Sequence, residues 1–125
     1  MDLFYKGEKM KKFNILKDSR EFTRIIKNNK AYKYKDYIIY LEKNTESNYK
    51  FGISVGKKIG NAVVRNKIKR QLKNIIDKKD YQKGFNCIII VGKGVLEKEF
   101  NQKEKNLHQA FSNLNIIKEK IYENK

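Results

Sequence analysis

No aspartate or glutamate occurs between Ser47 and Ile76, and seven of the residues from Lys57 to Ile76 are lysine or arginine. The whole chain of 125 residues carries 30 Lys+Arg against 14 Asp+Glu, which gives a formal net charge of +16. Self-repulsion of this size opposes a compact fold unless a polyanion lies nearby. The charge therefore favours nucleic acid as the partner, with an anionic membrane surface as the weaker alternative.

The length and the residue types of the chain narrow the classes of protein that it can belong to. The length fits one domain over residues 1–125, with an ordered core at about 11–117 and flexible tails at 1–10 and 118–125. The single cysteine excludes an internal disulfide and a cysteine-based zinc cluster, and the single histidine excludes a two-histidine acid–base pair for RNA cleavage. Apolar runs are too short for a membrane span, and residues 1–12 lack the apolar segment of a secretory signal. We expect a cytoplasmic protein.

The spacing of apolar residues predicts the secondary structure. Apolar side chains recur at helical spacing in three segments, which we predict to be helices: residues 18–28, 61–76 and 101–114. Asn61 is a good N-cap for the second helix. Asp18 with Glu21, and Asn101 with Glu104, have the spacing of capping boxes at the starts of the other two.

Three further segments have the pattern of strands: residues 34–41, 51–57 and 86–91. Residues 37–41 are apolar on both faces, so we expect them to be covered on both sides. A hairpin should join the first two strands. The predicted fold class is α+β. We expect a single small domain in which three helices pack on a sheet of about four strands, in the order α-β-β-(β)-α-β-α.

The helix expected at residues 61–76 is basic along one side. Its apolar residues share one face, and Arg65, Lys69 and Lys73 form an i, i+4, i+8 row beside that face. Like charges one turn apart destabilise a helix by a few tenths of a kcal/mol per pair, about as much as a pair of opposite charges stabilises it. A line of phosphates would offset this cost. The simpler interpretation is a solvated helix face, but a merely soluble surface normally mixes charges of both signs.

Residues 51–70 read FGISVGKKIGNAVVRNKIKR. This segment resembles the signature of the protein subunit of bacterial ribonuclease P, approximately G-(hydrophobic)-S-V-x-K-K-(hydrophobic)-G-x-A-V-x-R-N-R-(hydrophobic)-K-R. The match is ungapped, and the earlier Leu16-Lys17 and Glu21-Phe22 pairs fit the same family, so the resemblance covers roughly residues 11–114. Lys67 replaces the third residue of the R-N-R core, which keeps the charge but loses bidentate phosphate geometry. Ile26 stands where the family often has a second aromatic.

The resemblance implies a ribonucleoprotein endonuclease that removes the 5′ leader from precursor tRNA. In that family the RNA subunit is the catalyst and uses bound Mg²⁺, while the protein binds the RNA subunit and the single-stranded leader. The implied partners are therefore the ribonuclease P RNA and precursor tRNA, with no membrane and no protein partner required. The family also implies a left-handed βαβ crossover, against the general right-handed rule. No catalytic residue and no metal ligand is expected in the protein itself.

The same resemblance assigns two sets of site residues. The first should contact the RNA subunit and comprises Lys57, Lys58, Asn61, Arg65, Asn66, Lys67, Lys69, Arg70 and Lys73. The second should line a leader-binding cleft between the first helix and the sheet and comprises Phe22, Ile26, Tyr40 and Ser54. The resemblance places Tyr40 on the sheet face of Gly52, Ser54 and Gly56, which would leave room for a flat base. The alternative is that Phe22 and Tyr40 are ordinary core aromatics.

Two other reactive side chains are interpreted as structural. His108 lies within the last helix, and Cys87 lies inside an apolar strand as buried filler. Two other functions remain open on the residues alone. A ribosomal or other structured-RNA-binding protein would explain the basic helix without needing a leader cleft. A membrane-surface or nucleoid protein would act by charge alone and would not need the Gly52, Ser54 and Gly56 pattern.

Overall fold

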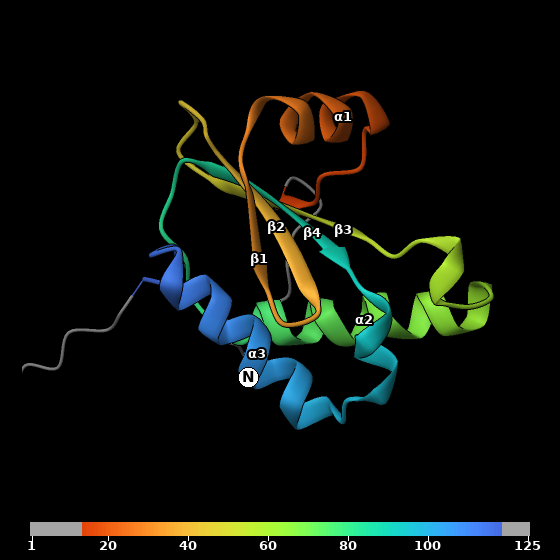
Figure 1. Cartoon of the computed structure of the whole chain (residues 1–125). Helices are drawn as coiled ribbons and strands as arrows, with labels where there is room; N and C mark the ends of the chain where they lie inside the picture. The colour runs from red at the N-terminus through yellow and green to blue at the C-terminus, as the bar shows by residue number, and fades with distance from the viewer. Residues whose placement is uncertain (1–13, 119–125) are drawn as a thin grey trace, which may run out of the picture.

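The computed structural model describes residues 14–118 and shows three α-helices and four strands within them (Figure 1). The elements follow in this order: α1 (Ser19–Asn28), β1 (Ala31–Tyr34), β2 (Tyr37–Lys43), β3 (Tyr49–Ser54), η2 (Lys57–Ile59), α2 (Ala62–Asp77), β4 (Phe85–Val91), η3 (Lys93–Glu97) and α3 (Phe100–Asn113). The predicted α+β class and element order are confirmed. The tails expected at residues 1–10 and 118–125 lie outside the described residues, apart from Lys118.

The strand order is β1-β2-β4-β3, with β4 at the centre of the sheet. The predicted hairpin between residues 34–41 and 51–57 is wrong, because β4 pairs antiparallel with β2 and parallel with β3. The hairpin instead joins β1 to β2 through a tight turn, in which Lys35 has a φ of 54°. Periodicity identifies strands but not their partners, and the most apolar strand, β4, takes an inner position where it pairs along both edges.

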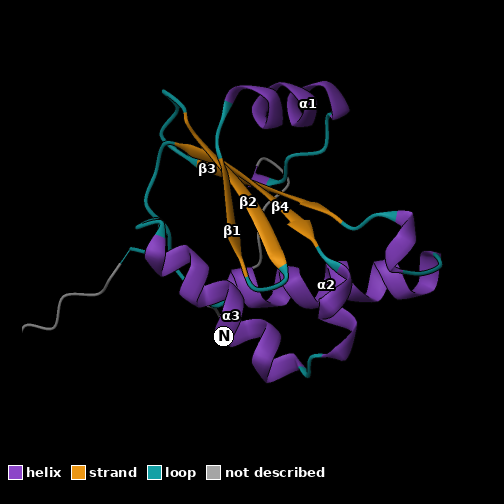
Figure 2. Cartoon of the chain, viewed as in Figure 1, coloured by secondary structure: helices purple, strands orange, loops and turns teal. Residues whose placement is uncertain are grey.

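The helices lie on both sides of the sheet (Figures 1 and 2), with α1 on one side and α2 and α3 on the other. β3 and β4 are parallel and α2 connects them, so the crossover expected from the family resemblance is present. Its left-handedness stays a prediction. The main core lies between the sheet and the α2–α3 layer, and an aromatic cluster fills it: Tyr49, Phe51, Tyr81, Phe85 and Phe111.

Packing of α2 and α3 explains the two isolated reactive residues. The His108 side chain on α3 donates from Nε2 to the backbone oxygen of Ile75 on α2, at 2.8 Å. Burial lowers the pKa of His108 and so favours the neutral ring, although the hydrogen bond to Ile75 acts in the opposite direction. Cys87 is fully buried in β4, and burial raises the pKa of its thiol. Both residues have the structural environment that the sequence indicated.

The helix starts agree with the sequence in part. Asn61 caps α2, since its side chain accepts from the backbone N–H of Val64 at 3.0 Å. Asp18 caps α1 by accepting from the backbone of Arg20, but the Glu21 carboxylate binds Arg24 and closes no capping box. The capping box of α3 is formed by Glu99 and Gln102, and not by Asn101 and Glu104. Helix α3 therefore begins one residue earlier than its apolar pattern suggested.

Candidate RNA interface

The sheet face that carries α1 is built in rows across three strands. The register places Tyr40 opposite Ile88 and Ile88 opposite Gly52, so these three residues point to the same side. The next row aligns Ile38, Ile90 and Ser54 in the same way. The predicted sharing of a face by Tyr40, Gly52 and Ser54 is therefore confirmed. The predicted floor of small residues is wrong, because β4 lies between and supplies two isoleucines.

Phe22 occupies the space above Gly52. A Cβ atom built on Gly52 would lie 2.5 Å from Cζ and 2.8 Å from Cε2 of Phe22, closer than real contacts allow. The ring of Phe22 therefore rests against the backbone of β3. The space over Gly52, expected to be open for a flat base, is therefore filled by a protein side chain, while Tyr40 lies two strands away. Gly52 is needed here for close approach rather than for an unusual backbone conformation.

Helix α1 covers only part of this face. Its ten residues bury Ile25, which packs with Leu16 and Ile88 in a second, smaller core. The prediction that residues 37–41 are fully covered on both sides is wrong, because Tyr37 and Ile39 are buried beneath α2 and α3 while Ile38 and Tyr40 are only half-buried. We use the name α1 face for the half-buried side chains on this side: Phe22, Ile26, Ile38, Tyr40, Ser54 and Ile90.

Sequence reasoning missed Ile38 and Ile90 as members of the α1 face. Both belong to strands whose apolar residues face both ways, a pattern that indicates burial on both faces. A ten-residue helix is too short to cover the whole sheet. Part of the apolar surface of these strands therefore remains accessible to solvent. A flat, partly exposed aromatic and aliphatic surface can stack against nucleobases without reading their sequence.

A polar network fixes α1 to the far end of the same sheet face. Arg24 on α1 binds both carboxylate oxygens of Glu42 on β2, at 2.6 and 3.1 Å. Asn86 on β4 donates to the same carboxylate at 2.9 Å, and Asn44 donates to Asn86 at 3.0 Å. The guanidinium of Arg24 lowers the pKa of Glu42. Exposed ion pairs add little stability, but a two-pronged contact fixes orientation, here that of the helix carrying Phe22 and Ile26.

Replacing Gly52 with alanine is expected to lower the free energy of unfolding by about 1–3 kcal/mol, because the new methyl group overpacks against Phe22. Urea denaturation measures the loss. Gly56→Ala is the matched control, since a Cβ there meets nothing within 4 Å and its φ of −74° suits any residue. The loss should shrink when Phe22→Ala is combined with Gly52→Ala. Equal losses in both backgrounds would show that Phe22 is not the group that Gly52 accommodates.

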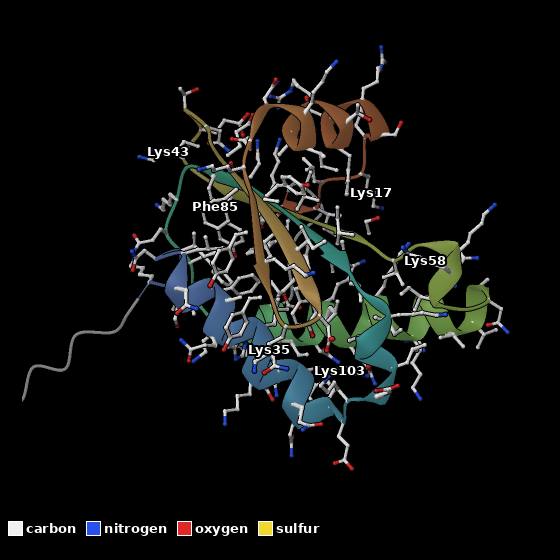
Figure 3. The ribbon with its side chains drawn as sticks, in the orientation of Figure 1. Lys17, Lys35, Lys43, Lys58, Phe85 and Lys103 are labelled. Carbon is white, nitrogen blue, oxygen red and sulfur yellow. The ribbon has the colours of Figure 1, made fainter. Side chains whose placement is uncertain are left out.

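The second surface is the solvent side of α2 together with the turn that precedes it. Seven of the nine predicted RNA-contacting residues are exposed: Lys57, Lys58, Asn61, Asn66, Lys67, Arg70 and Lys73. Figure 3 shows Lys58 beyond the end of β3, beside the start of α2. Ile68, Leu72, Ile75 and Ile76 are buried against the core, as the apolar periodicity predicted. We call the exposed side chains Asn66, Lys67, Arg70 and Lys73 the basic ridge.

Arg65 and Lys69 are half-buried rather than exposed. The Arg65 side chain donates from Nε to the backbone oxygen of Gly60 at 3.0 Å, and so it braces the turn that leads into α2. The side-chain oxygen of Asn61 likewise accepts the hydrogen bond that caps the helix. These two predicted contact residues therefore help to build the start of α2. The basic ridge itself begins one residue after Arg65.

The positive charge of the ridge is not balanced inside the described part of the chain. No ion pair formed among residues 14–118 includes a lysine or arginine from residues 57–73. A further lysine lies underneath, since Lys103 of α3 is buried and donates from Nζ to Gln71 at 2.6 Å. Burial first, and then the charge of Lys67, lower the pKa of Lys103. The surface therefore concentrates positive charge that phosphates can neutralise.

Metal centres and membrane spans are absent from the described residues. Within residues 14–118, no three histidine, cysteine, aspartate or glutamate side chains come together to hold a metal ion. No helix in that range has the length and apolar character needed to cross a bilayer.

Comparison with known proteins identifies the family of this chain. The model of the family Ribonuclease P matches residues 10–115. The ribonuclease P protein component of Mycoplasma capricolum is 45% identical over 94 residues, which cover 73% of this chain and 86% of that protein.

Solved structures agree as well. The ribonuclease P protein of Staphylococcus aureus has a TM-score of 0.76 at 26% identity, covering 84% of this chain and 98% of that one. The protein from Thermotoga maritima has a TM-score of 0.71 at 26% identity, covering 78% and 94%. The motif, the fold and these relatives together show that the chain belongs to the ribonuclease P protein family.

Proposed function

We propose that this protein is the RNA-binding subunit of a ribonucleoprotein that removes the 5′ leader from precursor tRNA. The basic ridge of α2 contacts the catalytic RNA, with Lys57 and Lys58 extending the same positive surface. The α1 face holds the single-stranded leader. The ribonuclease P RNA and precursor tRNA are the partners, and the assembly acts in the cytoplasm.

The observation that carries this proposal is the incomplete burial of the α1 face. Tyr40, Ile38 and Ile90 are apolar residues on a sheet, yet the helix above them leaves all three partly open to solvent. Stacking of bases on such a surface stabilises binding by about 1–3 kcal/mol per base and tolerates any sequence. A leader whose sequence varies between tRNAs requires that tolerance.

The chemistry of cleavage is assigned to the RNA subunit. We propose that the Mg²⁺ ions are held mainly by that RNA. The one histidine is engaged between α2 and α3, and the one cysteine is buried in β4. The protein contributes by binding substrate and by neutralising phosphates close to the catalytic RNA.

The alternative functions explain less of the molecule. Another structured-RNA-binding protein would use the basic ridge but has no need of a half-open apolar sheet face. A membrane-surface or nucleoid protein acting by charge alone would need neither the α1 face nor the close fit of Phe22 on Gly52. The ridge and the α1 face together favour a protein that binds folded RNA and a single strand.

Equilibrium binding to the assembled enzyme tests the proposal. The protein is combined with a bacterial ribonuclease P RNA, and affinities are measured for precursor tRNA and for mature tRNA lacking the leader. We expect the protein to strengthen binding of the precursor and to leave mature tRNA nearly unchanged. Equal strengthening of both would exclude leader binding. Failure to bind the RNA subunit at moderate salt would reject the proposed function as a whole.

A further inference from the structure

Val63, in the first turn of α2, is exposed to an unusual degree for an apolar residue. Its exposed fraction is 76%, and Leu96 in η3, at 47%, is the other large hydrophobic residue in residues 14–118 that is classed as exposed. Single exposed apolar residues are common on protein surfaces. Val63 differs because it lies within the most basic part of the chain, where it contributes neither charge nor core packing.

The position of Val63 on the helix connects it to the basic ridge. Asn66, Lys67 and Arg70 follow it at i+3, i+4 and i+7, which places all four on the same side of α2. Each of these residues is exposed. Val63 therefore projects from the same surface that presents the charges, at the end where α2 begins.

The start of α2 is held firmly, so Val63 has a fixed direction. Val64, the next residue, turns inward, and a Cβ built on Gly60 would lie 2.9 Å from its Cγ1. Asn61 caps the backbone of Val64, and Arg65 binds the oxygen of Gly60. A group fixed before binding loses less conformational entropy on contact than a flexible one.

Helix stability gives no reason for valine at this position. A β-branched residue is a poorer helix former than lysine or alanine, because the preceding turn restricts its χ1 angle. An exposed valine gains no burial in the free protein. Its methyl groups gain by burial only when another molecule covers them.

We propose that Val63 is an apolar contact of the RNA interface. It packs against the sugars and base edges of a folded RNA helix, while the neighbouring lysine and arginine side chains bind the phosphates of that helix. The minor groove of an RNA helix is wide and shallow and displays riboses and base edges. A short branched apolar side chain fits this surface, whereas phosphates are contacted by the lysines and arginine beside it. The ridge thus recognises shape as well as charge. This inference rests on the proposed function, since it names the contact chemistry of the RNA partner.

Substitution with lysine separates the proposal from a purely electrostatic ridge, because the two accounts predict opposite signs. Val63→Lys adds one positive charge, which by counterion release strengthens binding to any polyanion roughly fourfold at about 0.15 M salt. If Val63 packs against RNA, the same change weakens binding to the ribonuclease P RNA. We expect affinity for that RNA to fall about tenfold while affinity for single-stranded poly(U) rises. Val63→Ile should retain most of the wild-type affinity for the ribonuclease P RNA.

Leu96→Lys is the matched control, since it adds the same charge at the other exposed apolar residue. It should strengthen binding to both RNAs slightly. Thermal unfolding of each variant checks that the fold is kept, as expected for lysine at an exposed helix position. Tighter or unchanged binding of Val63→Lys to the ribonuclease P RNA would overturn the inference and leave the proposed function standing. Absence of binding by the unaltered protein would remove both.

Discussion

Tyr40→Ala should weaken the binding of precursor tRNA to the assembled enzyme by about 1–3 kcal/mol, the range for one stacked base, which is roughly 5- to 150-fold in affinity. Mature tRNA should bind nearly as before. The reason is that Tyr40 is half-buried on the α1 face and lies at the margin of the smaller core around Ile25 and Ile88. Titration of labelled precursor and mature tRNA against the holoenzyme measures both affinities.

Two variants separate stacking from general damage to the sheet. Tyr40→Phe keeps the aromatic ring and should retain most of the affinity for precursor. Tyr34→Ala removes a tyrosine that is also half-buried but packs with the main core on the other side of the sheet. It should not discriminate between the two tRNAs. If Tyr40→Ala weakens precursor and mature tRNA equally, Tyr40 is a structural residue and the leader does not stack on it.

Removing three charges from the basic ridge should have the largest effect on assembly with the RNA subunit. The variant combines Lys67→Ala, Arg70→Ala and Lys73→Ala. Each lost phosphate contact reduces the steepness of the plot of log binding constant against log salt concentration by about 0.7–0.9. Three such losses reduce affinity roughly 100-fold at about 0.15 M salt and lower the slope by about 2–3. Binding isotherms at several salt concentrations give both quantities.

The control for the ridge has the same net charge as the triple variant. Lys43, Lys83 and Lys105 are exposed lysines outside α2, and replacing all three by alanine removes as much charge from the protein. We expect a much smaller loss of affinity and little change in salt slope. Equal losses in the two triple variants would mean that the RNA subunit responds to total charge and not to the ridge.

The local structure of α2 was predictable because its signals lie close together in the sequence. Asn61 caps the helix, and the apolar residues from Ile68 to Ile76 recur at helical spacing, so both the start and the buried face followed directly. Exposure of Lys67 and Arg70 follows from the same periodicity. The partial burial of Arg65 did not, because its contact with Gly60 depends on how the preceding turn folds back.

Strand pairing was not predictable because it depends on contacts between distant segments. Alternating residues in β3 and β2 showed which side chains share a face within each strand, but not that β4 would lie between the two strands. The family resemblance gave the right face for Tyr40 and the wrong neighbours. Only the three-dimensional structure shows that Gly52 accommodates Phe22 and that Ile38 and Ile90 are half-buried members of the α1 face.

The central claim is that this protein binds and the RNA cuts, and a reconstituted cleavage reaction tests it most directly. Precursor tRNA is incubated at low Mg²⁺ with the protein alone, with a bacterial ribonuclease P RNA alone, and with both together. The account predicts fast release of the leader only when both are present, slow release by the RNA alone, and none by the protein alone. Cleavage by the protein without RNA, or no enhancement when the two are combined, would contradict it.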